Sequence, residues 1–165
     1  MKIVKVNYAN NSGYINLGCA FESEIIQVFP SFVKSSKNDD SEGIDGTMLY
    51  NGEKVTVQLK CMLHSDGGIN QKHGYSKAHK TSQKKLNDNV DYIILALPEV
   101  IDYNCYKLNH SLGVVYIVKR TQAIKRKLLK YDKKGEIYLD KTKRKILDIM
   151  VNDGYADPVD IIEVI

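Results

Sequence analysis

The residue pair Asn51-Gly52 constrains the fold of this chain more than any other feature of its sequence. It separates two stretches, IDGTMLY (44–50) and EKVTVQLKC (53–61), in which polar and apolar residues largely alternate. Alternation is typical of strands, and both positions of a tight hairpin turn need the positive φ that Asn and Gly adopt most easily. The sequence therefore predicts an antiparallel β-hairpin with a two-residue turn.

A two-residue turn determines which residues of the two strands face each other. Tyr50 then pairs with Glu53, and counting away from the turn brings Asp45 across from Gln58, with Cβ atoms about 5 Å apart. Because side chains alternate along a strand, Lys60 projects to the same side as Gln58. A β-bulge would change this pairing. One face of the hairpin is expected to be polar, and the other to be a core face of Ile44, Met48, Val55, Val57, Leu59 and Cys61.

Helical and extended patterns alternate along the rest of the chain. Helices are predicted at 16–32, 76–87, 121–130 and 141–152, and strands at 90–97, where Pro98 is expected to end the strand, at 113–118 and at 136–139. The order of these elements predicts a mixed α/β or α+β fold. A length of 165 residues corresponds to a single domain.

Composition excludes several classes of protein. No apolar run approaches the roughly 20 residues that a membrane-spanning helix needs. Cys19, Cys61 and Cys105 are far apart and form no CxxC pair, which predicts reduced thiols in a cytoplasmic protein. The chain lacks HExxH and zinc-finger spacings and has no GxxxxGK[ST] loop, which argues against zinc catalysis and against P-loop nucleotide hydrolysis.

Charge is distributed unevenly along the sequence. Residues 1–60 carry a net charge of −1, residues 61–145 carry +10 and residues 146–165 carry −5. A basic central segment fits a polyanionic partner, although a single surface lysine is more often only solvated. Around the helix predicted at 76–87, a surface that could grip a nucleic-acid backbone is formed by Lys72, Lys80, Gln83 and Lys84.

The hairpin would bring together three groups that suit phosphoryl chemistry. A carboxylate (Asp45) and an amide oxygen (Gln58) are hard ligands of the type that Mg²⁺ accepts. The Lys60 ammonium could orient a water molecule or offset negative charge that develops at a phosphoryl group. Glu22 and Glu24 in the first predicted helix are candidates for a further carboxylate ligand. The alternative is that the hairpin residues lie on a solvated face without a ligand.

These residues resemble a known family. The segments that carry the resemblance are GxxFE (Gly18, Phe21, Glu22), GID (Gly43, Ile44, Asp45) and VQLK (57–60). They are similar to the PD-(D/E)xK nuclease superfamily, and most of all to its Mrr-like branch, in which Gln replaces the first acid of the (D/E)xK element. YIILALP and GVVYIV also resemble members of that branch, and the resemblance covers roughly residues 15–120.

The resemblance implies a restriction-endonuclease-like α/β fold, with a mixed central β-sheet flanked by helices. It implies one nuclease-like domain with its core at about 15–120 and a helical C-terminal extension at 121–165. Glu22, Asp45 and Gln58 would hold Mg²⁺, or Mn²⁺ in its place, and Lys60 would assist the attacking water. Gln58 in place of Glu removes one negative charge, which should weaken ion binding and make Glu22 more important. Glu24 is a rival because it falls nearer the apolar stripe of the helix.

The expected function is Mg²⁺-dependent hydrolysis of phosphodiester bonds, with DNA as the favoured substrate and a defence or restriction role. One chain would carry one active site, so cutting both strands of a duplex would need a homodimer or two encounters. Two other interpretations remain open. The chain could be a nucleic-acid-binding module or degenerate nuclease without turnover, or a protein-interaction domain that uses its acidic residues at 148–163.

Overall fold

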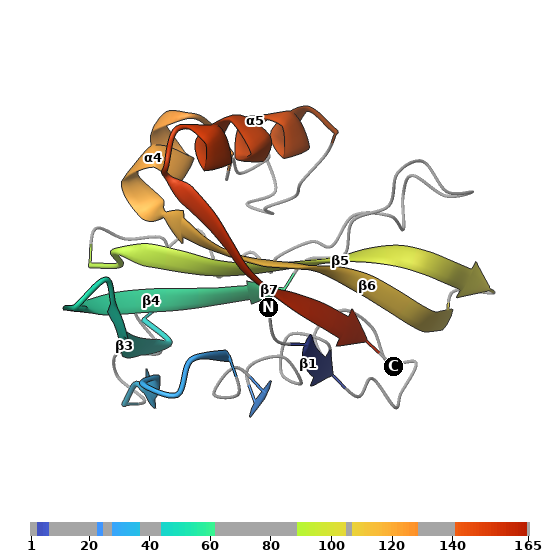
Figure 1. Ribbon diagram of the computed structural model, residues 1–165, viewed down its shortest axis with the longest axis horizontal. Coiled ribbons are helices and arrows are strands. Elements are labelled where there is room, and N and C mark those ends of the chain that lie inside the picture. The colour runs from blue at the N-terminus through green and yellow to red at the C-terminus, as the bar shows by residue number, and fades with distance from the viewer. Residues whose placement is uncertain are drawn as a thin grey trace.

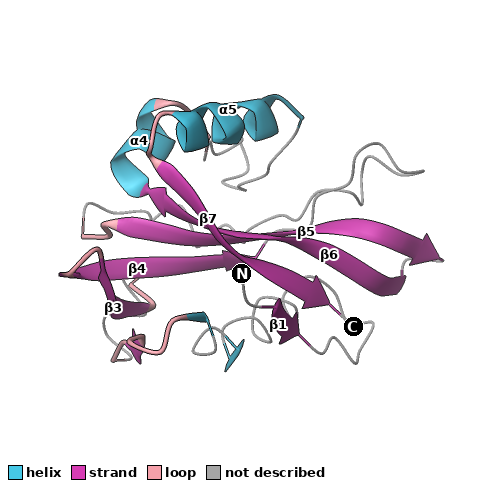
Figure 2. Ribbon diagram, in the orientation of Figure 1, coloured by secondary structure: helices cyan, strands magenta, loops and turns pink. Residues whose placement is uncertain are grey.

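The computed structural model describes residues 3–6, 23–24, 28–36, 44–61, 89–104, 107–128 and 141–164. They form a seven-stranded mixed sheet in the order β1-β7-β6-β5-β4-β3-β2, and helices α4 (Arg120–Lys125) and α5 (Lys141–Asn152) cover one face of it (Figures 1 and 2). The strands are β1 (Ile3–Val6), β2 (Val33–Lys34), β3 (Gly46–Tyr50), β4 (Glu53–Cys61), β5 (Tyr92–Asn104), β6 (Lys107–Lys119) and β7 (Ala156–Val164). A sheet with flanking helices confirms the expected α/β class.

The hairpin predicted at Asn51-Gly52 is confirmed. Both turn residues have positive φ, 52° at Asn51 and 82° at Gly52. The pairing of β3 with β4 runs in the predicted register, from Tyr50 opposite Glu53 to Gly46 opposite Val57. On its other side β4 pairs in parallel with β5, and β5 pairs antiparallel with β6. The hairpin therefore continues into the middle of the sheet.

Apolar side chains form a core on each face of the sheet. We call the face covered by α4 and α5 the helix side, and the other the opposite side (Figure 1). On the opposite side Met48, Val55, Val57 and Leu59 of the hairpin pack with Val28, Ile94, Ala96, Val115 and Ile117. On the helix side Ile93, Leu95, Leu97 and Val118 pack with Ala123, Leu128, Leu147 and Met150. A residue on either face of β4 thus faces apolar neighbours.

Strands β5 and β6 are longer than the sequence predicts. β5 continues through Pro98 to Asn104, where the prediction ended it. β4 ends at Cys61, which pairs with Ala96, so that beyond this point β6 is the partner that the structure describes for β5. A strand position with a neighbour on one side tolerates a residue that has no N–H. The proline therefore does not end the strand.

The opening helix ends earlier than predicted. Ser23, Glu24 and Val28 are helical, but the next residues form a turn in which the Phe32 N–H donates to the Phe29 carbonyl at 2.9 Å. β2 then follows at residues 33–34, directly after the predicted end of the helix at residue 32. Pro30 lies within this turn, where it has no N–H to continue the helical hydrogen-bond pattern.

The C-terminal part of the chain differs from the predicted helical extension at 121–165. Helix α5 has the predicted bounds, but α4 is shorter than the predicted 121–130. β7 lies inside the sheet, antiparallel to β6 and parallel to β1. The acidic residues at 148–163 consequently belong to α5, β7 and the turn between them.

Two predicted elements, at 76–87 and 136–139, lie outside the described residues. None of the helices within the described ranges has the length and apolar character needed to cross a membrane.

Candidate active site

Gln58 lies in the middle of β4 and is only 1% exposed. It is in register with Ile93 of the parallel strand β5, so its side chain lies on the helix side, beside the core that contains Ile93 and Leu95. Among the residues that the structure describes, its Oε1 has no hydrogen-bond partner. Leaving a buried polar atom unpaired costs about 1–3 kcal/mol. Buried polar groups are nearly always paired, so this oxygen calls for an ion, a water molecule or another ligand.

Asp45 directly precedes β3, and its carboxylate reaches the backbone of β4. The Leu59 N–H donates to Asp45 Oδ2 over 2.6 Å. In a regular continuation of the hairpin register Leu59 would face Ile44, whose carbonyl would accept that N–H. The carboxylate thus replaces a backbone acceptor, and it lies beside the peptide group that joins Gln58 to Leu59.

A β-bulge explains this departure from regular pairing. Gly46 is opposite Val57, and the Asp45 N–H also donates to the Val57 carbonyl at 3.0 Å, so two residues of one strand oppose one of the other. The bulge reverses the face of the preceding residue, because Ile44 packs with the helix-side core rather than with Met48. The prediction of a direct Asp45–Gln58 pair is replaced by a contact between the Asp45 carboxylate and the β4 backbone.

The backbone at the bulge is also held from β2. The Ser35 N–H donates to the Asp45 carbonyl at 2.9 Å. A Cβ atom on Gly46 would lie 2.5 Å from the Phe32 ring and from the Val33 carbonyl oxygen. Glycine is therefore needed at position 46 to let β2 approach, and this approach helps to hold the Asp45 carboxylate against β4.

Lys60 follows Gln58 on the same side of β4. It is in register with Leu95 of the helix-side core and is half-buried. A lysine in such a position can bury its methylene stem against apolar neighbours while its ammonium group stays close to solvent. The hairpin has the expected apolar face of Met48, Val55, Val57 and Leu59, whereas Ile44 packs on the other side. The polar residues Gln58 and Lys60 lie on that other side, beside apolar residues of β5. The Asp45 carboxylate reaches β4 at Leu59, the residue between Gln58 and Lys60.

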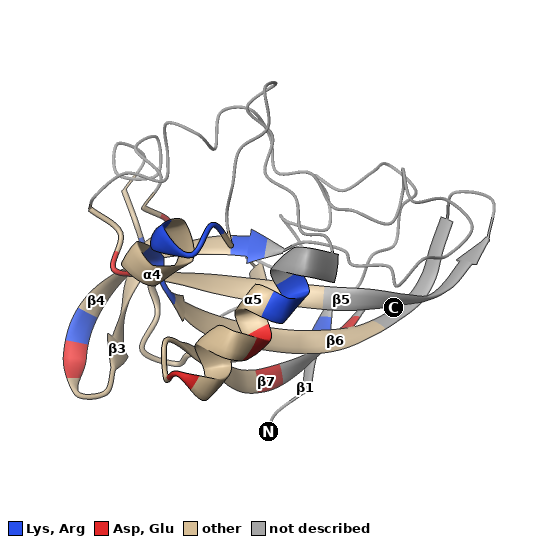
Figure 3. Ribbon diagram, turned by 90° about the horizontal axis from the view of Figure 1, so that it is seen from above, with Lys and Arg blue, Asp and Glu red and all other residues tan. Residues whose placement is uncertain are grey.

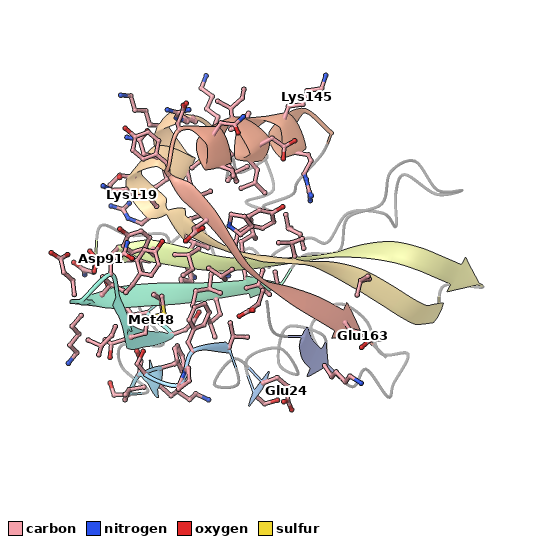
Figure 4. All side chains as sticks on the ribbon, in the orientation of Figure 1. Glu24, Met48, Asp91, Lys119, Lys145 and Glu163 are labelled. Carbon is pink, nitrogen blue, oxygen red and sulfur yellow. The ribbon has the colours of Figure 1, made fainter. Side chains whose placement is uncertain are left out.

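The opening helix lies on the opposite side of the sheet. Glu24 is half-buried and lies across the sheet from α4 and α5 (Figure 4). Val28, one turn later, packs with Met48 and Val57 in the core on that side. Glu24 therefore does not share a face with Gln58, which weakens its case as a ligand. Glu22 lies outside the described residues.

Within the described ranges no group of three or more His, Cys, Asp or Glu side chains could hold a metal ion. Of the expected ligands, the structure describes Asp45 and Gln58. A divalent-ion site at this point would need a further ligand, and the motif assigns that role to Glu22.

The four residues expected to contact nucleic acid, Lys72, Lys80, Gln83 and Lys84, lie outside the described residues. Other basic residues lie on the helices that cover the helix side, as the view onto these helices shows (Figure 3). Lys125, Lys127 and Lys145 are exposed there. Arg126, in contrast, pairs with Asp153 at 2.6 Å.

Arg120 is buried, and its Nε donates to the Val90 carbonyl at 2.6 Å. Its role is therefore to fix the chain where β6 enters α4, so it does not belong to an exposed basic surface.

Asp91 is a residue of the site region that the sequence analysis did not single out. Its Oδ2 accepts the Thr56 N–H at 2.9 Å and lies 3.0 Å from the Thr56 hydroxyl. The same hydroxyl lies 2.6 Å from the Asn89 carbonyl and accepts the Asp91 N–H at 3.1 Å. This network fastens the start of β5 to β4 two residues before Gln58. The sequence signal that could have identified Asp91 is an acidic residue immediately before an apolar strand.

No family model, curated protein or solved structure matches this chain. The arguments for its function are therefore the geometry around β4 and the short motifs of the sequence.

Proposed function

We propose that this chain is a metal-dependent phosphodiester hydrolase of the PD-(D/E)xK type, with DNA as its favoured substrate. The observation that carries the proposal is the buried, unpaired Oε1 of Gln58, together with an Asp45 carboxylate that accepts the N–H of the next residue of β4, Leu59. Amide and carboxylate oxygens are ligands that Mg²⁺ accepts. An ion with Asp45 and Gln58 among its ligands would supply the missing partner of Gln58, so these two residues fit part of the ligand set, and Glu22 would complete it.

The order of the strands supports a restriction-endonuclease-like arrangement. Asp45 stands at the start of β3, and Gln58 and Lys60 lie on the next strand, β4. β5 then runs parallel to β4 in the same mixed sheet. The motif residues therefore lie on adjacent segments, which lets a short sequence pattern form one site.

In the proposed mechanism Asp45, Gln58 and Glu22 hold Mg²⁺ or Mn²⁺. The ion would polarise a phosphoryl oxygen and acidify a bound water. The Leu59 N–H holds the Asp45 carboxylate in one orientation before substrate arrives, so little reorganisation is needed during the reaction. Lys60 orients the attacking water and offsets the negative charge that grows on the phosphoryl group.

The test is Mg²⁺-dependent cutting of plasmid DNA and of single-stranded RNA by the purified chain. Two variants, Asp45→Asn and Lys60→Met, should lower the cutting rate by about 10²-fold or more, a typical cost of losing one preorganised charged group. Lys54→Met is the matched control, because Lys54 is an exposed lysine of the same strand, near the hairpin turn. Equal cutting by all four proteins, or cutting that persists with a chelator, would overturn the proposal.

A second candidate is a nucleic-acid-binding module that keeps the fold without turnover. It is favoured by the exposed lysines Lys125, Lys127 and Lys145 on the layer of helices, and by the use of the Asp45 carboxylate in a backbone hydrogen bond. This candidate predicts DNA binding that survives Asp45→Asn and weakens with added salt, together with no cutting in Mg²⁺.

A further inference from the structure

A pocket separate from the proposed active site lies at the end of the sheet near the hairpin turn. It has a volume of about 140 Å³. Its walls include three tyrosines, Tyr50, Tyr92 and Tyr155, together with Lys119 and Asp157. Tyr50 and Tyr92 pack against the core of the opposite side, whereas Gln58 and Lys60 lie on the helix side. Tyr155, in contrast, packs with the helix-side core, and the Arg126 guanidinium lies 5.1 Å from its ring centroid. The pocket therefore lies at the end of the sheet, between its two faces, and none of its lining residues is Asp45, Gln58 or Lys60.

Tyr50 and Tyr92 give this pocket an aromatic wall. The rings of Tyr50 and Tyr92 meet edge to face, with centroids 5.0 Å apart and an angle of 69° between their planes. An apolar cavity of about 150 Å³ is large enough to hold benzene. The pocket therefore has room for one six-membered ring beside Tyr50 and Tyr92, and because it is open to solvent the rest of a ligand can extend outward.

The pocket is lined by charged side chains of opposite sign, Asp157 and Lys119. Asp157 is exposed, and its Oδ2 accepts a hydrogen bond from the Tyr50 hydroxyl at 3.3 Å. Lys119 is exposed as well, and the described residues include no ion pair of its ammonium group. The pocket therefore offers a carboxylate that accepts N–H donors and an ammonium that attracts an anion. A ligand that suits both carries adjacent N–H groups on a ring and a negative charge further along.

Guanine nucleotides have this combination. The ring N–H and the amino group of guanine lie side by side and can donate together to one carboxylate, whereas adenine has no such pair of donors. Aromatic walls stack on a base, a contact worth about 1–3 kcal/mol, and the phosphate can reach a lysine at the rim. A quaternary ammonium ion would also favour tyrosine faces, but Lys119 would repel it.

We propose that this pocket binds a guanine nucleotide, with the six-membered ring of the base against Tyr50 and Tyr92, its paired N–H groups on Asp157 and its phosphate on Lys119. This binding does not depend on the proposed hydrolase activity, because no residue of the pocket belongs to the Asp45–Gln58–Lys60 cluster.

The experiment titrates the chain with GMP, AMP, guanosine and choline, using calorimetry and tyrosine fluorescence, which is readable because the chain has no tryptophan. We expect GMP to bind saturably and AMP to bind more weakly by about tenfold or more. The affinity for guanosine should lie between the two. Absence of saturable binding by GMP would overturn the proposal. AMP binding as tightly as GMP, or choline binding in preference to both, would overturn it as well.

Two variants separate the roles of the polar groups. Asp157→Asn should raise the Kd for GMP by about tenfold or more while changing the Kd for AMP by less than about threefold. Lys119→Met should weaken the binding of GMP but not the binding of guanosine. The matched controls are Asp148→Asn and Lys54→Met, exposed residues of α5 and β4 outside the pocket. Wild-type GMP affinity in Asp157→Asn would overturn the proposal. Plasmid cutting should be the same in all four variants, so failure of one proposal is distinguishable from failure of the other.

Discussion

Thr56 and Gln58 are polar residues two positions apart on the same side of β4, and the fold treats them differently. The hydroxyl and N–H of Thr56 are paired with Asp91 and Asn89, whereas the Oε1 of Gln58 has no partner in the described part of the chain. Thr56 is partly exposed and could have turned to water, but Gln58 is buried. An unpaired polar atom is more costly at the buried Gln58 than at the partly exposed Thr56, yet Gln58 is the residue that lacks a partner. We interpret Thr56 as a structural residue and Gln58 as a ligand-binding one.

The largest effect is expected from Gln58→Met, a change of similar shape that removes the polar atoms. If Gln58 binds the metal ion, hydrolysis should fall by about 10²-fold or more. The free energy of unfolding without Mg²⁺ should stay the same or rise by about 1 kcal/mol, because a buried unpaired polar atom is lost. Plasmid cutting and urea denaturation measure the two quantities.

The same variant can be tested by the effect of Mg²⁺ on the free energy of unfolding. An ion that binds only the folded chain should stabilise the wild type by about 2.7 kcal/mol at a hundred times its Kd, and should stabilise Gln58→Met much less. Gln122→Met, on α4, is the matched control. If Gln58→Met lost stability but kept its cutting activity, Gln58 would be a structural residue like Thr56.

Asp91→Ala should have the next largest effect, this time on stability alone. It removes a carboxylate that accepts from both the N–H and the hydroxyl of Thr56, and hydrogen bonds to a charged group are worth about 1.5–3 kcal/mol. We expect the free energy of unfolding to fall by about 2 kcal/mol, measured by urea denaturation. Asp148→Ala, which removes an exposed carboxylate on α5, should cost only a few tenths of a kcal/mol. Similar losses in the two variants would contradict the structural role of Asp91.

Thr56→Val tests the other partner of the same network with a smaller expected effect. The β-branched shape is kept, but the Asn89 carbonyl and the Asp91 N–H lose the hydroxyl. Because these groups are near solvent and water can replace the hydroxyl, the loss should be about 1 kcal/mol. Cutting should remain at the wild-type rate. A loss of cutting together with a small loss of stability would move Thr56 into the catalytic group.

The smallest effect is expected at Tyr50, the last residue of β3, which lies at the hairpin turn. Burial, the charge of Asp157 and the hydrogen bond to it raise the pKa of Tyr50 above its ordinary value of 10.0. The unfolded chain therefore releases this proton first, and the free energy of unfolding should fall as the pH rises above 10.0. Tyr50→Phe should reduce this decline by a few tenths of a kcal/mol, as urea denaturation on both sides of that pH would show. An unchanged pH dependence in the variant would refute the assignment.

Local signals predicted the parts of the molecule that depend on local physics. The Asn51-Gly52 turn determines the hairpin register by itself, and the apolar periodicity of 141–152 suffices to predict α5. β1 and β7 were missed because they pair with each other across almost the whole sequence, Ile3 with Ile161. Pro158 and the acidic residues of β7 further weaken its strand pattern.

For the candidate site, the sequence predicted the residues better than their surroundings. Gln58 and Lys60 share one side of β4 as predicted, but Asp45 contacts the Leu59 N–H instead of pairing with Gln58. The bulge was not predictable, because a short carboxylate at position 45 competes with the Ile44 carbonyl for the Leu59 N–H. The burial of Gln58 was not predictable either, since it depends on β5 and on the helix-side core, which are remote in sequence.

The parallel pairing of β1 with β7 also bears on the order of folding. Bringing together the first and last described strands closes a very long loop, and this entropy must be offset before the contact stabilises anything. The hairpin of β3 and β4 closes a loop of two residues. We therefore expect the hairpin of β3 and β4, next to Asp45 and carrying Gln58 and Lys60, to form early during synthesis. The pairing of β1 with β7 at the edge of the sheet should form last.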